Sequence, residues 1–369
     1  MQPVQELTDA TVARARLRSL LLTGDGPQSF AGIATWFGAM QAQDVASGKW
    51  SLGVRVTGSQ EADVDAAFEN AELVRTWPMR GTIHIVPAQD IRWMLALTGI
   101  RALDASRTRR AQLGFDEAEA QRGSSVLETA LRERGRLTRA QCLDTLQQAG
   151  ISTDGQRGYH LLGYAAHTGL ICIGPNLGTE QTFVLIDEWA PTQVALTRDE
   201  ALAELAFRYF RSHGPAPLRD FTGWTGLTLT DGRAALRAND GRLVARGFRG
   251  EDVWLTAELA RHVDDGSAGV WSAAAALPGF DEFVLGYKDR TVQIIAADFD
   301  RIVPGGNGVF RPTLCLDGRA VGTWTRAIKR TEVVVDFAPF RPLNARDRKR
   351  AAAAFAPYAA YLGRDLRLG

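Results

Sequence analysis

Residues 73–86, Leu-Val-Arg-Thr-Trp-Pro-Met-Arg-Gly-Thr-Ile-His-Ile-Val, contain two β-rich runs that Arg80-Gly81 separates. Three earlier segments, residues 8–22, 29–40 and 59–70, repeat apolar side chains at helical spacing. Two short strands around a tight turn are typical of a hairpin. The order helix, helix, helix, hairpin predicts a winged helix.

The same order of elements returns twice along the chain. The second copy has helical patterns at 124–134, 138–149 and 156–168, followed by β-rich runs at 170–173 and 182–186. The third has helical patterns at 198–212, 217–224 and 228–239, followed by β-rich runs at 243–248 and 252–255. An order found three times is stronger evidence than a single copy. We therefore predict winged helices in residues 1–100, 101–192 and 193–265.

Residues 266–369 differ in character from the rest. Five short β-rich runs occupy residues 283–287, 292–296, 309–316, 320–326 and 331–337, and a helical pattern covers 344–362. Asp317-Gly318 is a strong two-residue hairpin signal. We therefore predict an α+β protein, with three tandem winged-helix motifs followed by a small antiparallel β-sheet or barrel and a C-terminal helix.

Composition narrows the classes of protein that fit. The 369 residues are 45% hydrophobic and carry a net charge of +1, which argues against a nonspecific polyanion binder. Residues 1–5 lack the basic and apolar regions of a secretion leader, and no apolar run approaches the ~20 residues of a membrane span. The three cysteines are far apart in apolar contexts, which predicts buried thiols. We expect a cytoplasmic protein with no metal site, no cofactor and no membrane partner.

Gln41-Ala42-Gln43 is the candidate catalytic motif. Two amides that are two residues apart can converge on one point, and each can donate and accept hydrogen bonds. Together Gln41 and Gln43 could hold a water molecule and a sugar oxygen without carrying charge. The alternative is a pair of solvated polar side chains near a helix end.

Other segments carry candidate DNA contacts. Arg80, Thr82 and His84 lie in the first hairpin, where an arginine can take a phosphate and a histidine can reach a base or phosphate. The alternative for His84 is a buried sheet residue.

The C-terminal region adds two further groups. We predict that Gly305, Gly306 and Asn307 form a flexible tip between two strands that enters a DNA groove, with an ordinary exposed turn as the alternative. Lys288 and Arg290 are candidate phosphate contacts. The neighbouring acids Asp281, Glu282 and Asp289 are compatible with a glycosidase carboxylate pair, but the flanking β pattern gives no sign that two of them converge.

Four blocks of sequence resemble the AlkZ-like, or YcaQ-like, DNA glycosylases. They are Met40–Asp44, Trp77–His84, Leu277–Asp281 with Gly286–Arg290, and Gly306–Pro312. The resemblance implies tandem winged helices around a concave DNA-binding face. It also implies cleavage of the N-glycosidic bond of alkylated purines and of some bulky or crosslinked adducts.

The resemblance assigns a catalytic role to Gln41 and Gln43, as the Gln-Φ-Gln motif of one branch of that family. Ala42 is a small middle residue for that motif. The expected partner is double-stranded DNA carrying alkylated purines, bound by a monomer, in DNA repair or in self-resistance to a genotoxic natural product. The competing hypothesis is a noncatalytic winged-helix DNA-binding protein such as a transcriptional regulator.

Overall fold

The structure is a computed structural model that describes residues 6–369, so the prediction on a leader in residues 1–5 lies outside the described residues. The chain is a mixed α+β protein, as predicted. It forms two compact units, one of residues up to Val64 together with Ala203–Gly369, and one of Asp65–Leu202. Within the described residues, no helix is long and apolar enough to cross a membrane.

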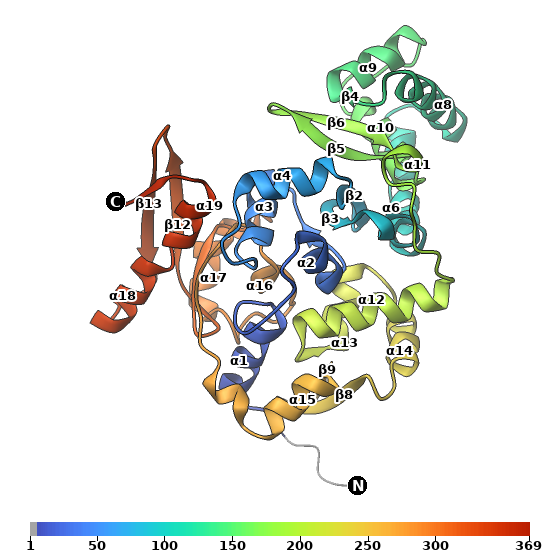
Figure 1. Cartoon of the computed structure of the whole chain (residues 1–369). Helices are drawn as coiled ribbons and strands as arrows, with labels where there is room; N and C mark the ends of the chain where they lie inside the picture. Colours follow the sequence, from blue (N-terminus) through green and yellow to red (C-terminus); the bar gives the residue numbers. More distant parts are fainter. Residues whose placement is uncertain (1–5) are drawn as a thin grey trace. The chain divides into compact units, whose positions relative to one another are not determined.

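The unit of Asp65–Leu202 contains one antiparallel sheet with the strand order β3, β2, β5, β6, β4 (Figure 1). The strands are β2 (Leu73–Met79), β3 (Thr82–Pro87), β4 (Leu137–Thr138), β5 (Ile171–Leu177) and β6 (Glu180–Leu185). The helices are α5 (Ile91–Met94), α6 (Ile100–Ala105), α7 (Arg107–Gln112), α8 (Glu117–Arg134), α9 (Arg139–Gln148), α10 (Arg157–His167) and α11 (Ile186–Trp189). Leu127, Leu161 and Phe183 share one buried cluster, so α8 and α10 pack on this sheet.

The N-terminal and middle segments of the other unit hold the candidate catalytic motif. They contain α1 (Asp9–Ser19), α2 (Phe30–Phe37), β1 (Met40–Gln41), α3 (Val45–Gly53), the start of α4 (Glu61–Glu69), most of α12 (Arg198–His213), α13 (Leu218–Thr225), α14 (Leu229–Ala238) and α15 (Ala257–Asp264). The strands β7 (Ala216–Pro217), β8 (Leu243–Phe248) and β9 (Glu251–Thr256) form a small sheet in the order β7, β9, β8.

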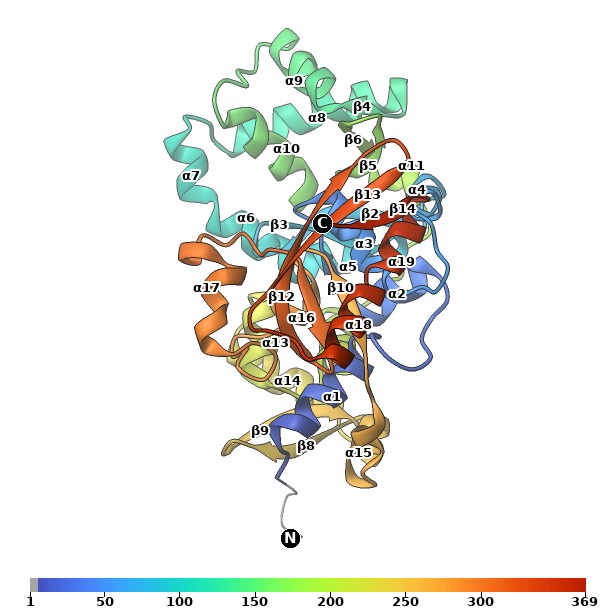
Figure 2. The same ribbon diagram turned by 90° about the vertical axis from the view of Figure 1, so that its left-hand side faces the viewer.

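The C-terminal part of the same unit is a curled sheet of five strands. These are β10 (Ala274–Leu277), β11 (Thr313–Leu316), β12 (Arg319–Ile328), β13 (Glu332–Pro339) and β14 (Asp365–Leu368), paired in that order, with β14 parallel to β13. Figure 2 shows β12 and β13 as long strands beside each other, with α18 (Ala345–Ala353) and α19 (Ala356–Tyr361) next to them. Trp324 of β12 packs against Phe355 and Tyr358, which fixes this helical segment to the sheet.

Local sequence signals account for several of these elements. Thr138 and Thr228 each begin a helix with a capping box, in which side chain and backbone exchange hydrogen bonds with the residue three positions later. Asp317 and Gly318 both adopt positive φ in the β11–β12 turn, as a type I′ hairpin requires. All three cysteines are buried and free, as predicted.

Several predicted elements are wrong. Residues 283–287 and 292–296 are not strands: the first lies mostly in helix α16 (Glu282–Leu285) and the second is a turn followed by a short helical segment. Both runs are short and apolar, and such runs do not distinguish a buried strand from a buried helix. The strands β10 and β14 were not predicted.

Two further corrections concern helices. The sequence predicts a short break at Ser47-Gly48 after the Gln-Ala-Gln segment, but both residues lie inside α3, because Asp44 caps that helix by accepting the Ser47 N–H at 2.8 Å. The single helix predicted for 344–362 is divided into α18 and α19 at residues 354–355.

Candidate active site

The Gln-Ala-Gln motif connects a short strand to a helix. Gln41 ends β1 and is 9% exposed, whereas Gln43 is exposed. Asp44 then caps α3, so the backbone changes from extended to helical within three residues. The motif is therefore held at both ends by regular structure.

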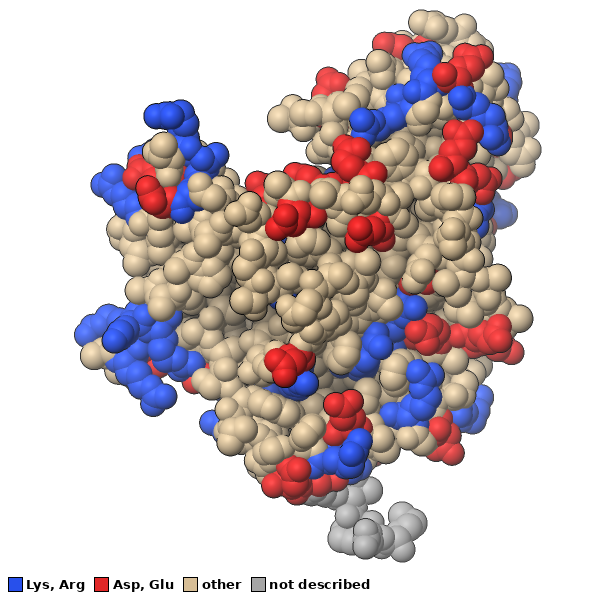
Figure 3. All heavy atoms as spheres, viewed as in Figure 1, with Lys and Arg blue, Asp and Glu red and all other residues tan. Residues whose placement is uncertain are grey.

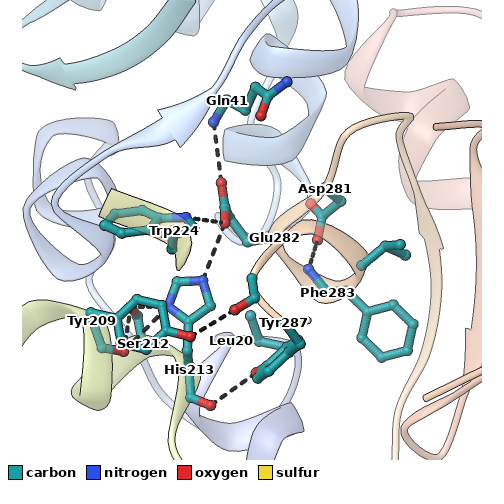
Figure 4. A network of polar contacts seen from close by, with 12 residues as sticks. Leu20, Gln41, Tyr209, Ser212, His213, Trp224, Asp281, Glu282, Phe283 and Tyr287 are labelled. Carbon is teal, nitrogen blue, oxygen red and sulfur yellow. Dashed lines mark hydrogen bonds and ion pairs between the residues drawn. The ribbon is translucent and has the colours of Figure 1, made fainter. Parts of the chain in front are cut away.

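A buried carboxylate fixes the backbone of this motif. The Gln41 N–H donates to Glu282 Oε1 at 3.2 Å. Glu282 Oε2 accepts from Trp224 Nε1 at 3.0 Å and from His213 Nε2 at 3.2 Å. Glu282 and His213 are each at most 1% exposed. In Figure 4 the Gln41 side chain extends away from Glu282, which leaves its amide outside this network.

Three groups surround the Glu282 carboxylate. The Gln41 and Trp224 N–H groups can only donate, so both oxygens of Glu282 act as acceptors. His213 Nε2 is the third partner, and His213 Nδ1 lies 2.8 Å from Ser212 Oγ. These contacts together hold Glu282 in place.

The His213 ring is held by close packing. It stacks on Tyr209 with ring centroids 4.5 Å apart and an angle of 9° between the planes. Tyr209 Oη in turn donates to the Gly286 carbonyl at 2.7 Å. A Cβ atom at Gly286 would lie 2.2 Å from His213 Cδ2, so only glycine fits there. This packing fixes the imidazole toward Glu282.

The preceding residue, Asp281, anchors α16 to α3. Its carboxylate accepts from Arg55 at 2.8 and 2.9 Å and from Ser51 Oγ at 2.7 Å. Burial acts to raise the pKa of Asp281, but the Arg55 charge and its hydrogen bonds outweigh burial and lower the pKa overall. Phe280, just before it, has φ of +61°, an unfavourable conformation for a bulky residue. Asp281 and Glu282 thus connect one short helix to the first residue of the Gln motif and to residues that follow the motif.

The predicted contacts of the first hairpin lie in the unit of Asp65–Leu202. Arg80 is exposed at the β2–β3 turn and Thr82 is half-buried. His84 is fully buried, and its Nδ1 lies 2.9 Å from the Thr82 carbonyl oxygen. This burial favours the sheet-residue alternative for His84.

The C-terminal candidates lie in the same unit as the Gln motif. Lys288 is exposed, and Arg290 donates to the Val284 carbonyl at 2.7 Å, so both lie just beyond α16. Gly305, Gly306 and Asn307 are exposed.

Gly305, Gly306 and Asn307 do not form the predicted tip between two strands. Gly305 and Gly306 belong to a 3₁₀ turn (Pro304–Gly306) that follows α17 (Phe299–Ile302) and precedes the extended segment leading to β11. The upstream run was predicted as a strand because it is apolar, but it is a turn. Gly305 and Gly306 are exposed, as an exposed tip requires, but the predicted hairpin is wrong.

Comparison with known proteins identifies the family. The model of the AlkZ-like DNA glycosylase family matches residues 9–361. The chain belongs to the AlkZ-like DNA glycosylases. It is therefore a DNA glycosylase, an enzyme that hydrolyses N-glycosidic bonds.

Two relatives agree with this family assignment. The chain is 24% identical over 302 residues to the interstrand DNA cross-link repair glycosylase of Streptomyces sahachiroi, covering 77% of this chain and 79% of that protein. The solved structure of Streptomyces sahachiroi DNA glycosylase AlkZ matches 99% of this chain and 100% of that chain, with a TM-score of 0.79 and 20% identity. The second match shows that the two share a fold.

The sequence did not reveal the network behind the motif of this AlkZ-like chain. Glu282 was considered only as half of a carboxylate pair, and His213 and Trp224 were not considered. Glu282 lies 58 residues from Trp224, 69 from His213 and 241 from Gln41, so no spacing pattern marks them. The other two candidate acids form different contacts, since Asp281 binds Arg55 and Asp289 lies 3.3 Å from Arg249.

Proposed function

We propose that the enzyme hydrolyses the N-glycosidic bond of alkylated purines, of the N7-guanine type, in duplex DNA. Bulky and crosslinked adducts belong to the proposed substrates, because the Streptomyces sahachiroi relative is named for interstrand cross-link repair. The enzyme acts as a monomer, in DNA repair or in self-resistance to a genotoxic compound. Family membership favours this function over that of a noncatalytic regulator.

The chemistry needs no charged base. An N7-alkylated guanine is cationic, so the C1′–N9 bond can break with its electron pair leaving on the base, which becomes neutral. The sugar develops oxocarbenium character, a water oxygen bonds to C1′, and the water proton passes to solvent. In the proposal Gln43 orients the water and Gln41 supports the sugar or phosphate through preorganised amides. Such a site discriminates against uncharged purines because they leave poorly.

The observation that carries this proposal is the hydrogen bond from the Gln41 N–H to the buried Glu282 carboxylate. A catalytic amide contributes only when its position is fixed before the reaction. Glu282 is itself held by His213 and Trp224, so the backbone at Gln41 is fixed while its side chain stays outside the network.

The order and pairing of the elements support the proposed winged helices. In each of two segments, three helices precede a hairpin, and a short strand pairs with the hairpin's second strand: β4 with β6, and β7 with β9. These arrangements support winged helices in residues 101–192 and 193–265, and the order of α2, α3, α4, β2 and β3 supports a third in residues 1–100. Residues 266–369 complete the proposed set of four regions.

We further propose that the duplex contacts come from two groups of residues. One group comprises Arg80, Thr82 and His84, and the other comprises Lys288, Arg290, Gly305, Gly306 and Asn307. The exposure of Arg80, Lys288 and Asn307 supports their roles, and His84 has the weakest support because it is buried.

Base release from duplex DNA with N7-alkylguanine adducts tests the function. Small and bulky adducts are compared in parallel, using wild type, Gln41→Ala/Gln43→Ala and the matched control Gln147→Ala/Gln148→Ala on α9. We expect release by the wild type and the control, and loss in the motif variant with duplex binding retained. Release that persists in the motif variant contradicts the assigned roles, and no release from any adduct despite DNA binding contradicts the proposed substrates.

A further inference from the structure

A cavity separate from the Gln motif lies in the unit of residues up to Val64 with Ala203–Gly369. Its volume is about 430 Å³, within the range of about 300–1,000 Å³ that small-molecule sites occupy. Its lining comes from the end of α1, from α2, α12 and α15, from Arg242 just before β8 and from Thr256 at the end of β9. Figure 3 shows Lys and Arg atoms next to Asp and Glu atoms over the region where α12 lies in Figure 1.

Three arginines line this cavity without a carboxylate partner. Arg18 donates to the carbonyls of Thr23 and Asp25, and Arg211 donates to the carbonyls of Thr35 and Trp36. Arg242 donates to the side-chain oxygen of Asn239 at 3.2 Å.

Within residues 6–369, none of these three guanidinium groups forms an ion pair. By contrast Arg208, one turn before Arg211 on α12, pairs with Glu204 at 2.7 Å. The cavity therefore brings together three arginines that form no ion pair among the described residues.

Aromatic rings hold two of these guanidinium groups in place. Arg242 lies over the Phe207 ring with its guanidinium carbon 3.6 Å from the centroid. Arg211 lies over Trp36 at 4.5 Å and over Phe207 at 5.3 Å. Trp36 is itself fixed, because its Nε1 donates to the Ser19 carbonyl at 2.8 Å. Arginines that are stacked in this way are preorganised for a planar or tetrahedral anion.

Arg211 also carries an unmet donor. Its buried Nε has no hydrogen-bond partner among the described residues, and a buried donor without a partner is costly. Burial, together with the charges of Arg208 and Arg242, lowers the pKa of Arg211 to about 10, against the opposing charge of Glu204. At neutral pH the guanidinium of Arg211 stays charged, so an anion in the cavity would relieve the repulsion between the arginines.

We propose that this cavity binds the phosphate group of a nucleotide. Arginine is the side chain best suited to phosphate, and three of them line this one cavity. The nucleotide is either free or part of a nucleic-acid strand. Glu258, an exposed acid in the same lining, opposes the anion and limits its affinity.

Isothermal titration of the whole chain with dGMP tests this proposal, with deoxyguanosine as the probe that lacks the phosphate. We expect dGMP to bind with a Kd below about 1 mM and deoxyguanosine not to bind. Arg242→Ala and Arg211→Lys should each weaken dGMP about tenfold, the effect of losing one charge-assisted hydrogen bond. Glu258→Gln should strengthen it.

The control is Arg346→Ala/Arg348→Ala, which removes exposed arginines of α18 and should leave dGMP binding unchanged. Thermal unfolding without ligand establishes that each variant is folded. Displacement of dGMP by undamaged duplex assigns the site to a nucleic-acid strand, and persistence of dGMP binding assigns it to free nucleotides; both uphold the proposal. Absent binding, equal binding of deoxyguanosine, or an unchanged Kd in both arginine variants overturns it. None of these readouts depends on base release.

Discussion

The Glu282 carboxylate accepts the backbone N–H of Gln41 at 3.2 Å, although 241 residues separate them in the sequence. This bond joins α16 to the end of β1 and sets the backbone of the candidate catalytic motif. Because Glu282 is buried and contacts the motif through this bond, we expect it to act by positioning Gln41.

Glu282→Gln should impair catalysis more than binding. Its new amide N–H₂ faces groups that donate only, including the Gln41 N–H and Trp224 Nε1, so the backbone at Gln41 shifts. We expect kcat for base release to fall about 10²-fold, the scale of a small misplacement of a catalytic group, with KM for duplex DNA nearly unchanged. Single-turnover kinetics measure this. Glu332→Gln, which neutralises an acid on β13, is the control, and equal losses in both variants contradict the positioning role.

Gly286→Ala should destabilise the fold. The added Cβ would lie 2.2 Å from His213 Cδ2, and overpacking of this kind costs about 1–3 kcal/mol. Urea unfolding gives the change in the free energy of unfolding. Gly163→Ala on α10 is the control, because a Cβ there meets nothing within 4 Å and alanine is the better helix former. Similar stability for both variants would show that the ring has room to move.

Arg55→Met should cost more stability than Arg55→Met/Asp281→Asn. The single change leaves a buried carboxylate without its cation, which typically costs about 3–5 kcal/mol, whereas the double change removes the uncompensated charge. Midpoints of urea unfolding at constant m-value measure both variants. If the double variant is the less stable, desolvation of Asp281 is not the dominant cost.

Stability in acid should depend on Asp317. Hydrogen bonds from Arg350 lower its pKa to about 2, so the folded state holds this carboxylate ionised below its ordinary pKa. The contribution is fully present above about pH 4, the unfolded pKa, and is lost as the pH falls toward 2. Unfolding free energies between pH 5 and 2 should therefore fall less steeply in Asp317→Asn than in the wild type. Equal slopes would refute this linkage.

Local signals predicted much of the fold. Thr138 and Thr228 mark helix starts through caps formed within four residues, and Asp317-Gly318 marks a turn through its own φ angles. Residues 283–287 were misassigned because burial on all sides removes the periodicity that separates a strand from a helix.

The candidate site also contains residues that the sequence predicts and residues that it does not. Gln41 and Gln43 could be predicted because they lie two residues apart in the sequence and match a known motif. Glu282, His213 and Trp224 were missed because their relationship exists only after folding. A single sequence can therefore reveal functional residues that form a short motif. It does not reveal the buried residues, distant in sequence, that hold the motif in place.

The two adjacent acids of α16 also restrict how this enzyme can vary. Glu282 binds Gln41, and Asp281 binds Ser51 and Arg55. The two ends of the segment 41–55 are therefore held by two neighbouring residues. An insertion or deletion there would release one anchor whenever the other was kept. We therefore expect related enzymes to keep the length of this segment unchanged and to accommodate insertions in turns such as 304–308.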